Sequence, residues 1–343
     1  MKKLSFFEKI IFWCNSIVAF LLLISFVLPF LPPKSFPAIA LLSLTVSPLI
    51  LLTFLFGLYW LLKLKKQFVL SAVMLFAAYS FFNPFYKFSS NDQVSSNDHT
   101  ISVLSYNVRL FNLYEKNENT SNIAEVLNNT LTKAAPDVVF IQEYYRNTSH
   151  KFSKYPHRYI HFKNDKVLLG HAIFSKYPLV NKGAFDFVKT YNNTLFADII
   201  KGNDTLRLYN LHLKSLKINP SVNSLQEQDK NMLYGRITLA FQKQQEQAEA
   251  ILKHMNMTKY PIILGGDFNN TAFSYVYRTL KKGMKDTFLE KGSGLGTTFT
   301  FDSYPLRIDY IFGSKTLEVI DFSTLEETFS DHAPIAAVFR IPQ

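Results

Sequence analysis

The sequence predicts an α/β domain of packed sheets flanked by helices, preceded by transmembrane helices. Two observations predict this. Three long uncharged apolar runs dominate the first 87 residues, and the rest of the chain mixes short apolar runs with amphipathic stretches. Short runs rich in Ile, Val, Phe and Tyr are typical of strands, and apolar residues three and four apart are typical of helices. Strands mixed with helices, without strict alternation, favour packed sheets covered by helices.

The apolar runs at Ile10–Leu31, Phe36–Leu62 and Phe68–Tyr86 predict three transmembrane helices. About 20 apolar residues span the ~30 Å hydrocarbon core of a bilayer. A signal peptide is the alternative for the first run, because Lys2 and Lys3 precede it, although no small-residue cleavage site follows. The third run is the shortest and the most polar, so a re-entrant or interfacial helix is the alternative there.

Charge predicts the orientation of these helices. Residues 1–87 carry eight Lys, no Arg and one acidic residue, Glu8, so they supply +7 of the formal net charge of +11. Because basic loops stay in the cytoplasm, the N-terminus is expected inside and everything after Tyr86 outside an inner or plasma membrane, in the periplasm or the extracellular space. If the third run does not cross, the domain after it is cytoplasmic. The lysines flanking the runs on the predicted cytoplasmic side are Lys2, Lys3, Lys9, Lys63, Lys65 and Lys66, against only Lys34 in the first loop.

The predicted domains are a transmembrane region over 1–87, a polar linker over 88–100 and a catalytic domain over 101–343. The linker prediction rests on the polar stretch Ser89–Thr100, which has no apolar periodicity. The single cysteine, Cys14, lies in the first apolar run, which excludes disulfides and thiolate metal sites in the domain that follows. The +4 charge left to that domain gives weak support for nucleic-acid binding.

Nine apolar runs predict strands in the domain, and two amphipathic stretches predict helices. The predicted helices cover residues 123–131, ahead of Pro136, and Arg236–Met255. The predicted strands are Ile101–Tyr106, Val138–Gln142, Val167–Phe174, Leu195–Ile200, Leu206–Leu213, Ile262–Gly265, Ile308–Phe312, Leu317–Phe322 and Ile335–Arg340.

Acid, amide and imidazole side chains stand at the ends of several predicted strands. Taken singly, each has a structural alternative as a turn residue, a helix cap, a surface carboxylate or a buried core histidine. Together they predict one site, because strand ends hold polar groups rigidly and so many acids and amides in one place require a cation. These side chains are Asn107, Glu143, Asn210, His212, Asp267, Asn269 and Asp309, with Asp331 and His332 further on.

A hard cation such as Mg²⁺ prefers carboxylate and amide oxygens, so Glu143 is the leading metal ligand, with Asn107 beside it. The metal would polarise a phosphoryl oxygen and offset charge in the transition state. Asp267 suits the general base that activates water, and Asn269 lies two residues on, where it points the same way and orients water or phosphate.

Two histidines are candidates for contact with the phosphoryl group. An imidazolium that donates to a phosphoryl oxygen makes a strong charge-assisted hydrogen bond, and both His332 and His212 are placed for it. Asp309 is the natural partner for His332, because a buried Asp fixes the tautomer of a His and raises its pKa.

These motifs, in this order over about Ile101 to Ile341, resemble the endonuclease/exonuclease/phosphatase superfamily. It takes in pancreatic deoxyribonuclease, abasic-site endonucleases, neutral sphingomyelinases and inositol-polyphosphate phosphatases. The segments from Gly170 to Pro178 and from Thr297 to Phe299 also match. The resemblance implies a four-layer α/β/β/α sandwich and a divalent cation, Mg²⁺ or Mn²⁺.

The resemblance also implies a role for each residue of the site. It implies metal binding by Glu143 with Asn107 and Asp331, and a general base with its orienting amide in Asp267 and Asn269. It implies a phosphate-stabilising His332 held by Asp309. The segment from Asn210 to His212 resembles the deoxyribonuclease and sphingomyelinase branches, where this His also contacts the phosphate. His171 receives no role from the resemblance.

The predicted function is a membrane-anchored, divalent-metal-dependent hydrolase of phosphate esters, with three hypotheses for what it acts on. The first is a phosphodiesterase or endonuclease acting on nucleic acid. The second is a lipid phosphodiesterase, similar to sphingomyelinase, or a phosphatase; the anchor favours it, and Leu216–Tyr234 is a segment able to touch lipid or cover the site. The third is a non-catalytic receptor or scaffold, which the intact set of acids, amides and histidines argues against. No protein partner is inferred.

Overall fold

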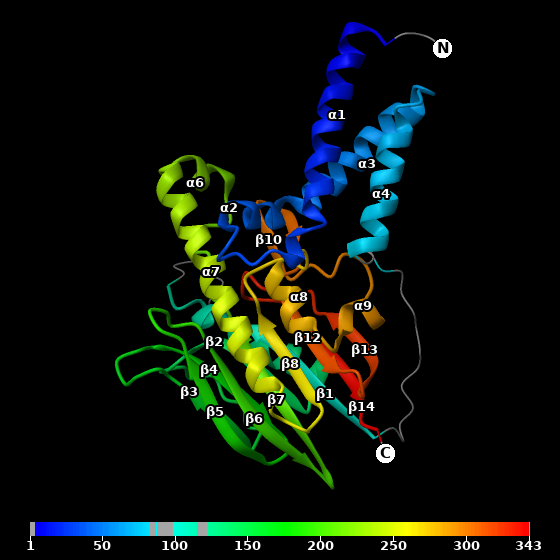
Figure 1. Cartoon of the computed structure of the whole chain (residues 1–343). Coiled ribbons are helices and arrows are strands. Elements are labelled where there is room, and N and C mark those ends of the chain that lie inside the picture. The colour runs from blue at the N-terminus through cyan, green and yellow to red at the C-terminus, as the bar shows by residue number, and fades with distance from the viewer. Residues whose placement is uncertain (1–3, 83–86, 88–98, 115–121, 343) are drawn as a thin grey trace.

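The structure is a computed structural model that describes residues 4–82, 87, 99–114 and 122–342. Three long helices stand on one end of a body built from two β-sheets (Figure 1). A capping box opens the first helix, because the Ser5 hydroxyl accepts from the Glu8 amide and the Glu8 carboxylate accepts from the Ser5 amide. The helical elements before the sheets are α1 (Phe6–Ser25), η1 (Leu28–Phe30), α2 (Pro37–Ala40), η2 (Leu41–Thr45), α3 (Val46–Leu62) and α4 (Phe68–Phe82).

Two of the three predicted transmembrane helices have the length and composition to cross a membrane. They run over Phe6–Phe30 and Pro37–Leu62, with 25 and 26 residues. Helix α4 is apolar but has 15 residues, or about 22 Å at 1.5 Å per residue, which is shorter than a bilayer core of about 30 Å. Residues 83–86, which the sequence assigns to this third run, lie outside the described residues, as does the predicted linker up to residue 98. Thr100, also assigned to the linker, is the first residue of a strand.

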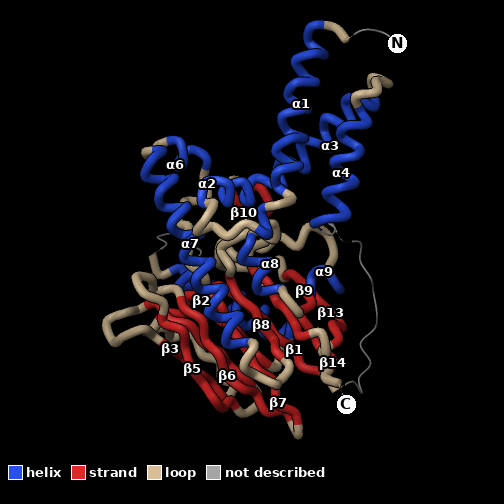
Figure 2. Tube along the Cα trace, in the orientation of Figure 1, coloured by secondary structure: helices blue, strands red, loops and turns tan. Residues whose placement is uncertain are grey.

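Two six-stranded mixed sheets form the body (Figure 2). In the first, the strand order is β13-β14-β1-β2-β4-β3, and in the second it is β5-β6-β7-β8-β12-β9. The first sheet contains β1 (Thr100–Asn107), β2 (Val138–Tyr145), β3 (His157–His161), β4 (Leu169–Ser175), β13 (Glu318–Thr324) and β14 (Ile335–Arg340). The second contains β5 (Leu179–Asp186), β6 (Asn193–Lys201), β7 (Asp204–His212), β8 (Ile262–Asp267), β9 (Met284–Asp286) and β12 (Asp309–Ser314), and β10 (Phe299–Phe301) pairs with β11 (Tyr304–Leu306) as a separate hairpin.

The two sheets pack face to face, with helices on their outer faces. Alternate residues of each strand point inward, so Val103 and Phe140 of the first sheet meet Leu208 and Ile263 of the second in one buried core. The intervening residues point outward, where Leu104 packs with residues of α5. The result is the expected α/β/β/α arrangement. The helices of the body are α5 (Ile123–Ala134), α6 (Val222–Gln226), α7 (Lys230–Met255), α8 (Tyr275–Lys281) and α9 (Thr287–Lys291), with a short turn η3 (Arg109–Asn112).

All nine predicted strands lie in the two sheets, and both predicted helices are present, α7 beginning six residues earlier than expected. The sequence missed β3, β5 and the short strands β9, β10 and β11. Strand β5 lies at a sheet edge, and most of its residues are exposed or half-buried, so it lacks the apolar run that marks a covered strand.

The N-terminal helices pack directly on the body instead of being joined to it by a tether alone. Phe273 of the body is buried in the same cluster as Val46 of α3 and Met74 of α4. Its ring also meets Phe82 edge to face at 4.9 Å between centroids. A second contact between the two parts is a hydrogen bond of 2.9 Å that Thr271 Oγ1 donates to the backbone carbonyl of Ser43. The helices and the body are therefore in contact through both apolar packing and hydrogen bonds.

Candidate active site

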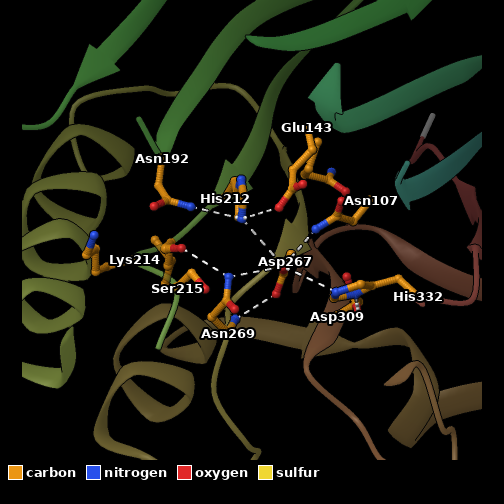
Figure 3. A network of polar contacts seen from close by, with 12 residues as sticks. Asn107, Glu143, Asn192, His212, Lys214, Ser215, Asp267, Asn269, Asp309 and His332 are labelled. Atoms are coloured by element: carbon orange, nitrogen blue, oxygen red, sulfur yellow. Dashed lines mark hydrogen bonds and ion pairs between the residues drawn. The ribbon is translucent and has the colours of Figure 1, made fainter. Parts of the chain in front are cut away.

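The predicted site residues come from strand ends that meet at one edge of the sandwich. Strands β1 and β2 are parallel neighbours in one sheet, and β7 and β8 are parallel neighbours in the other, so the carboxyl ends within each pair lie together. The register places His212 opposite Asp267, and Asp309 of β12 opposite the other side of Asp267. Figure 3 shows the side chains of Glu143, Asn107 and His332 turned toward Asp267.

The backbone ahead of Asp267 depends on a glycine. Gly266 has a φ of +139°, and a Cβ at this position would lie 2.0 Å from the backbone oxygen of Leu211. Only glycine fits both the conformation and the close approach of β7. Gly266 therefore allows β8 to deliver Asp267 to the site.

Asp267 is buried, and its carboxylate accepts three hydrogen bonds. Oδ1 accepts from the Asn269 backbone amide at 2.7 Å. Oδ2 accepts from Asn107 Nδ2 at 3.1 Å and from Asn269 Nδ2 at 3.0 Å. Burial raises the pKa of Asp267 to about 7, although His332 opposes the shift. A carboxylate with a pKa near neutrality is suited to accept a proton from water at physiological pH.

His332 forms a buried pair with Asp309, as the sequence predicts. Its Nδ1 donates to Asp309 Oδ2 at 2.9 Å, and its Nε2 lies 3.8 Å from Asp267 Oδ2. Burial by itself lowers the pKa of His332, but the carboxylates of Asp309 and Asp267 outweigh it and raise the pKa to about 10. His332 is therefore an imidazolium at neutral pH, with Nε2–H directed into the site.

Glu143 and Asn107 lie side by side across from Asp267 (Figure 3). Glu143 sits at an irregularity in the pairing of β2 with β4 and has a φ of +53°. A non-glycine residue in this region costs about 1–3 kcal/mol and is typical of functional sites. Burial raises the pKa of Glu143; His332 works against this shift, and the neighbouring carboxylate of Asp331 adds to it.

The oxygen set of Glu143, Asp331 and Asn107 fits a hard divalent cation. The carboxylate of Glu143, whose pKa burial raises, lies near that of Asp331, and a positive charge between the two would stabilise both; Asn107 adds an amide oxygen. A second group of possible ligand atoms, from Asp267, Asp309 and His332, lies within 4.8 Å of one another. In that group His332 Nδ1 already donates to Asp309, and Asp267 already accepts three hydrogen bonds.

His212 faces the site but differs from His332 in its charge. Asn192 Nδ2 lies 2.9 Å from His212 Nε2, and His171 Nε2 lies 2.9 Å from His212 Nδ1. Because Asn192 Nδ2 donates, His212 Nε2 accepts this hydrogen bond. In a neutral His212 the ring proton is then on Nδ1, which donates to His171 Nε2. Burial, reinforced by His171 and His332, lowers the pKa of His212 well below its usual value. Of the two histidines, His332 is therefore the one whose pKa favours the imidazolium form at neutral pH.

Asn210, expected among the catalytic residues, lies beneath the site and ties the two sheets together. Its Nδ2 donates to the backbone oxygens of Ile141 at 3.0 Å and Ala172 at 2.9 Å, and its Oδ1 accepts from Gln142 Nε2 at 2.7 Å. Since the side chain is fully buried and its amide atoms are bonded within the fold, we assign it a positioning role.

A cavity of about 510 Å³ lies over the site. We call the predicted site residues that line it the polar side. These residues are Asn107, Glu143, Asp267, Asn269, Asp331 and His332. His212, Asn210 and Asp309 are not among the residues that line the cavity.

Sequence reasoning missed several residues that shape the site. Asn192 and Gln142 had no recognisable motif, and His171 had no role, yet each makes a hydrogen bond to His212 or Asn210. Arg109 lines the cavity and lies 3.6 Å from Asp331. The only available signal for Arg109 was its position two residues after Asn107.

Comparison with known proteins agrees with the fold and with the motifs. Residues 104–332 match the Endonuclease/Exonuclease/phosphatase family, and residues 8–85 match a domain family of unknown function. The structure is similar to D. rerio TDP2 complexed with single strand DNA product, with 20% identity and a TM-score of 0.53 over 71% of this chain and 100% of that chain. No curated protein matches the chain.

Two further solved structures are similar. A family protein from Bacteroides thetaiotaomicron has 19% identity and a TM-score of 0.53 over 72% of this chain and 100% of that chain. The human Nocturnin catalytic domain with a bound sulfate anion has 18% identity and a TM-score of 0.52 over 73% and 97%. At these identities the likeness shows a shared fold.

Proposed function

Because the chain belongs to the endonuclease/exonuclease/phosphatase family, we propose that it is a divalent-metal-dependent hydrolase of phosphate esters held at a membrane by its N-terminal helices. The observation that carries the proposal is the convergence of Asp267, His332 and Glu143 on one cavity. A base near neutral pKa, a cationic donor and an oxygen set for a metal are the groups that phosphate-ester hydrolysis requires.

The first part of the proposed chemistry is activation of water. Asp267 takes a proton from a water molecule while the water oxygen forms a bond to phosphorus. Both N–H groups of the Asn269 amide are directed into the protein, at Asp267 Oδ2 and the Leu213 carbonyl. Its Oδ1 is then the atom that accepts a hydrogen bond from the attacking water. Proximity and orientation of this kind lower the barrier without any covalent intermediate.

The second part is stabilisation of the charge that develops on the phosphoryl group. His332 Nε2–H donates to a non-bridging oxygen, and Asp309 holds the ring in the tautomer that makes this possible. The bond from phosphorus to the leaving oxygen breaks, and that oxygen takes a proton from solvent, giving an alcohol and a phosphate product. A Mg²⁺ or Mn²⁺ ion on Glu143, Asn107 and Asp331 would neutralise charge on the phosphoryl oxygens.

The membrane part of the proposal rests on α1, α3 and α4. At the end of these helices far from the sheets, Lys65 Nζ lies 3.6 Å from Glu8 Oε1, so the start of α1 and the turn between α3 and α4 are neighbours (Figure 1). Lys63 and Lys66 are next to that turn, whereas Lys34 pairs with Glu246 of the body. This distribution supports a cytoplasmic end at Glu8 and Lys65 and a catalytic body on the opposite side. Packing of α1 in one cluster with α3 and α4 supports a retained helix over a cleaved signal sequence.

The test uses the full chain in detergent with Mg²⁺ or Mn²⁺, assayed on bis(4-nitrophenyl) phosphate and 4-nitrophenyl phosphate. We expect turnover that EDTA abolishes and that Asp267→Ala lowers by ~10²-fold or more, the usual contribution of a positioned general base. The exposed carboxylate of Asp321 on β13 offers a matched control, Asp321→Ala, which retains the wild-type rate. Absence of turnover in the wild type would favour a non-catalytic scaffold, and full activity of Asp267→Ala would refute the assigned base.

A further inference from the structure

The cavity over the site has a second side that the proposed hydrolysis does not use. Its lining also contains aliphatic residues, and we call six of them, which come from the N-terminal helices and from the segment around α6 and α7, the apolar side. They are Leu44 and Pro48 from η2 and α3, Leu216, Leu225 and Leu233 from the segment before and within α6 and α7, and Ile237 of α7. Water activation and phosphate binding need none of these side chains.

The apolar side is held in place by contacts with the catalytic loop itself. Thr271 follows Asn269 and Asn270 in the loop after β8, and its hydroxyl donates to the Ser43 carbonyl one residue before Leu44. Asn270 Nδ2 donates to Gln244 of α7 at 2.8 Å. Both segments that supply the apolar side are thus tied to the loop that carries Asn269.

The apolar side is also continuous with the surface of a helix proposed to lie in the membrane. Leu44 and Pro48 flank the start of α3, and the same helix exposes Leu51, Leu52 and Leu55 one and two turns further on. A hydrocarbon chain lying along α3 is therefore close to the apolar residues that line the cavity. Exposed apolar area of this kind is unfavourable in water and stable against lipid or an apolar ligand.

From this arrangement, and resting on the proposed function, we propose that the ester hydrolysed here carries a hydrocarbon chain. The phosphate lies on the polar side, and the chain lies along the apolar side toward α3, as in a lipid phosphate ester drawn from the membrane that holds the helices. A cavity of about 510 Å³ accepts a phosphate group together with part of such a chain.

The distribution of basic residues argues against nucleic acid as the occupant. Tracking a polyanion requires several cations along one groove. Lys217 and Arg109 are the lysine and arginine that line the cavity. Lys281 and Lys282 line a different depression beside α8, and Lys285 Nζ donates to the Leu317 carbonyl.

The test measures how hydrolysis depends on chain length at constant leaving group. The full chain, transferred to an amphipol, is assayed with Mn²⁺ on methyl, butyl and hexyl esters of 4-nitrophenyl phosphate, which are water-soluble and release the same 4-nitrophenolate. Full burial of each methylene improves binding about fourfold, so we expect kcat/KM to rise at least ~10-fold from the methyl to the hexyl ester.

Variants separate the apolar side from the rest of the surface. Leu225→Asn and, independently, Leu44→Asn lower the hexyl-to-methyl ratio of kcat/KM at least ~3-fold, whereas Leu239→Asn, on an exposed position of α7, keeps the wild-type ratio. Two variants on different elements guard against a folding defect in one of them, and size-exclusion profiles check both.

Each outcome is decisive. A flat ratio in the wild type, an unchanged ratio in both cavity variants, or faster cleavage of single-stranded DNA or RNA than of the hexyl ester overturns the hydrocarbon-chain inference while leaving the hydrolase standing. Failure to release 4-nitrophenolate from any ester overturns the proposed hydrolase as well. A rising ratio that both cavity variants reduce supports the inference.

Discussion

Asp309 fixes His332 through a buried hydrogen bond of 2.9 Å to Nδ1, and the ring consequently presents Nε2 to Asp267. The two residues are separated by 22 others in the sequence, and β12 and the loop before β14 bring them together. This pair determines both the charge and the direction of the imidazolium.

The pair predicts a shift in the alkaline limb of the pH–rate profile. Activity needs the protonated His332, so it falls as the pH rises through the His332 pKa, which the carboxylates of Asp309 and Asp267 raise to about 10 against the effect of burial. Asp309→Asn removes one of these carboxylates and lowers that pKa, so the alkaline limb moves to lower pH. The measurement is kcat/KM for bis(4-nitrophenyl) phosphate across pH. A limb that stays where it is in Asp309→Asn speaks against His332 as the group that titrates.

The proposed role of Glu143 as a metal ligand leads to a prediction about the affinity for Mn²⁺. Replacing its carboxylate in Glu143→Gln removes a charged oxygen from the assigned set, and we expect Mn²⁺ binding to weaken by at least ~10-fold. Titration of the full chain with Mn²⁺, followed by the electron paramagnetic resonance of the free ion, measures this directly. Glu326→Gln, at an exposed position, is the matched control and keeps the wild-type affinity. Equal affinities for Glu143→Gln and the control would place the ion elsewhere.

The backbone conformation and close packing of Gly266 lead to the prediction that its substitution strongly lowers stability. A Cβ there would lie 2.0 Å from the Leu211 oxygen at a φ of +139°, so Gly266→Ala forces β7 and β8 apart and lowers the free energy of unfolding by at least ~2 kcal/mol. Gly235, on α7, has open space around the Cβ position. Gly235→Ala is therefore the control and raises helix stability by up to ~1 kcal/mol. Thermal midpoints of the two variants in the same detergent give the comparison, and equal midpoints would contradict the packing described for β8.

The buried hydrogen bonds of Asn210 lead to a prediction about thermal stability, although Asn210 does not line the cavity. Asn210→Ala removes the side-chain donor to the buried carbonyls of Ile141 and Ala172 and leaves the Gln142 amide with its hydrogen bond to Ser105 alone. Unpaired buried polar groups cost about 1–3 kcal/mol each, so the thermal midpoint is expected to fall clearly. The exposed Asn256→Ala serves as the reference. An unchanged midpoint in Asn210→Ala would show that water replaces the amide and that the bridge is dispensable.

The strands and the strand-end residues were predictable because their signal is local. A covered strand needs apolar residues at nearly every position, as in β2 and β8, and the polar residue that ends such a run stands out from its neighbours. Parallel pairing then brings these ends together without further information. Asp267, Asn107 and Glu143 were found in this way.

What the sequence could not supply depends on contacts between distant segments. The neutral state of His212 results from burial beside His171, which lies on a strand of the other sheet. The positive φ of Glu143 arises from a pairing irregularity that no motif marks. The aliphatic residues of the apolar side come from η2 and α3 and from the segment around α6 and α7, which are at least about 170 residues apart, so hydropathy alone shows neither their proximity nor their relation to the site.

The hydrogen bond between Thr271 and the Ser43 carbonyl has a kinetic consequence. It couples the loop carrying Asn269 to a segment that leads straight into α3, so in the proposed membrane arrangement the reacting groups stay at a constant height above the bilayer. Encounter with the proposed membrane-borne ester is then lateral diffusion in two dimensions. The rate should follow the surface density of the reactant in the bilayer, and diluting the suspension as a whole should leave it unaltered.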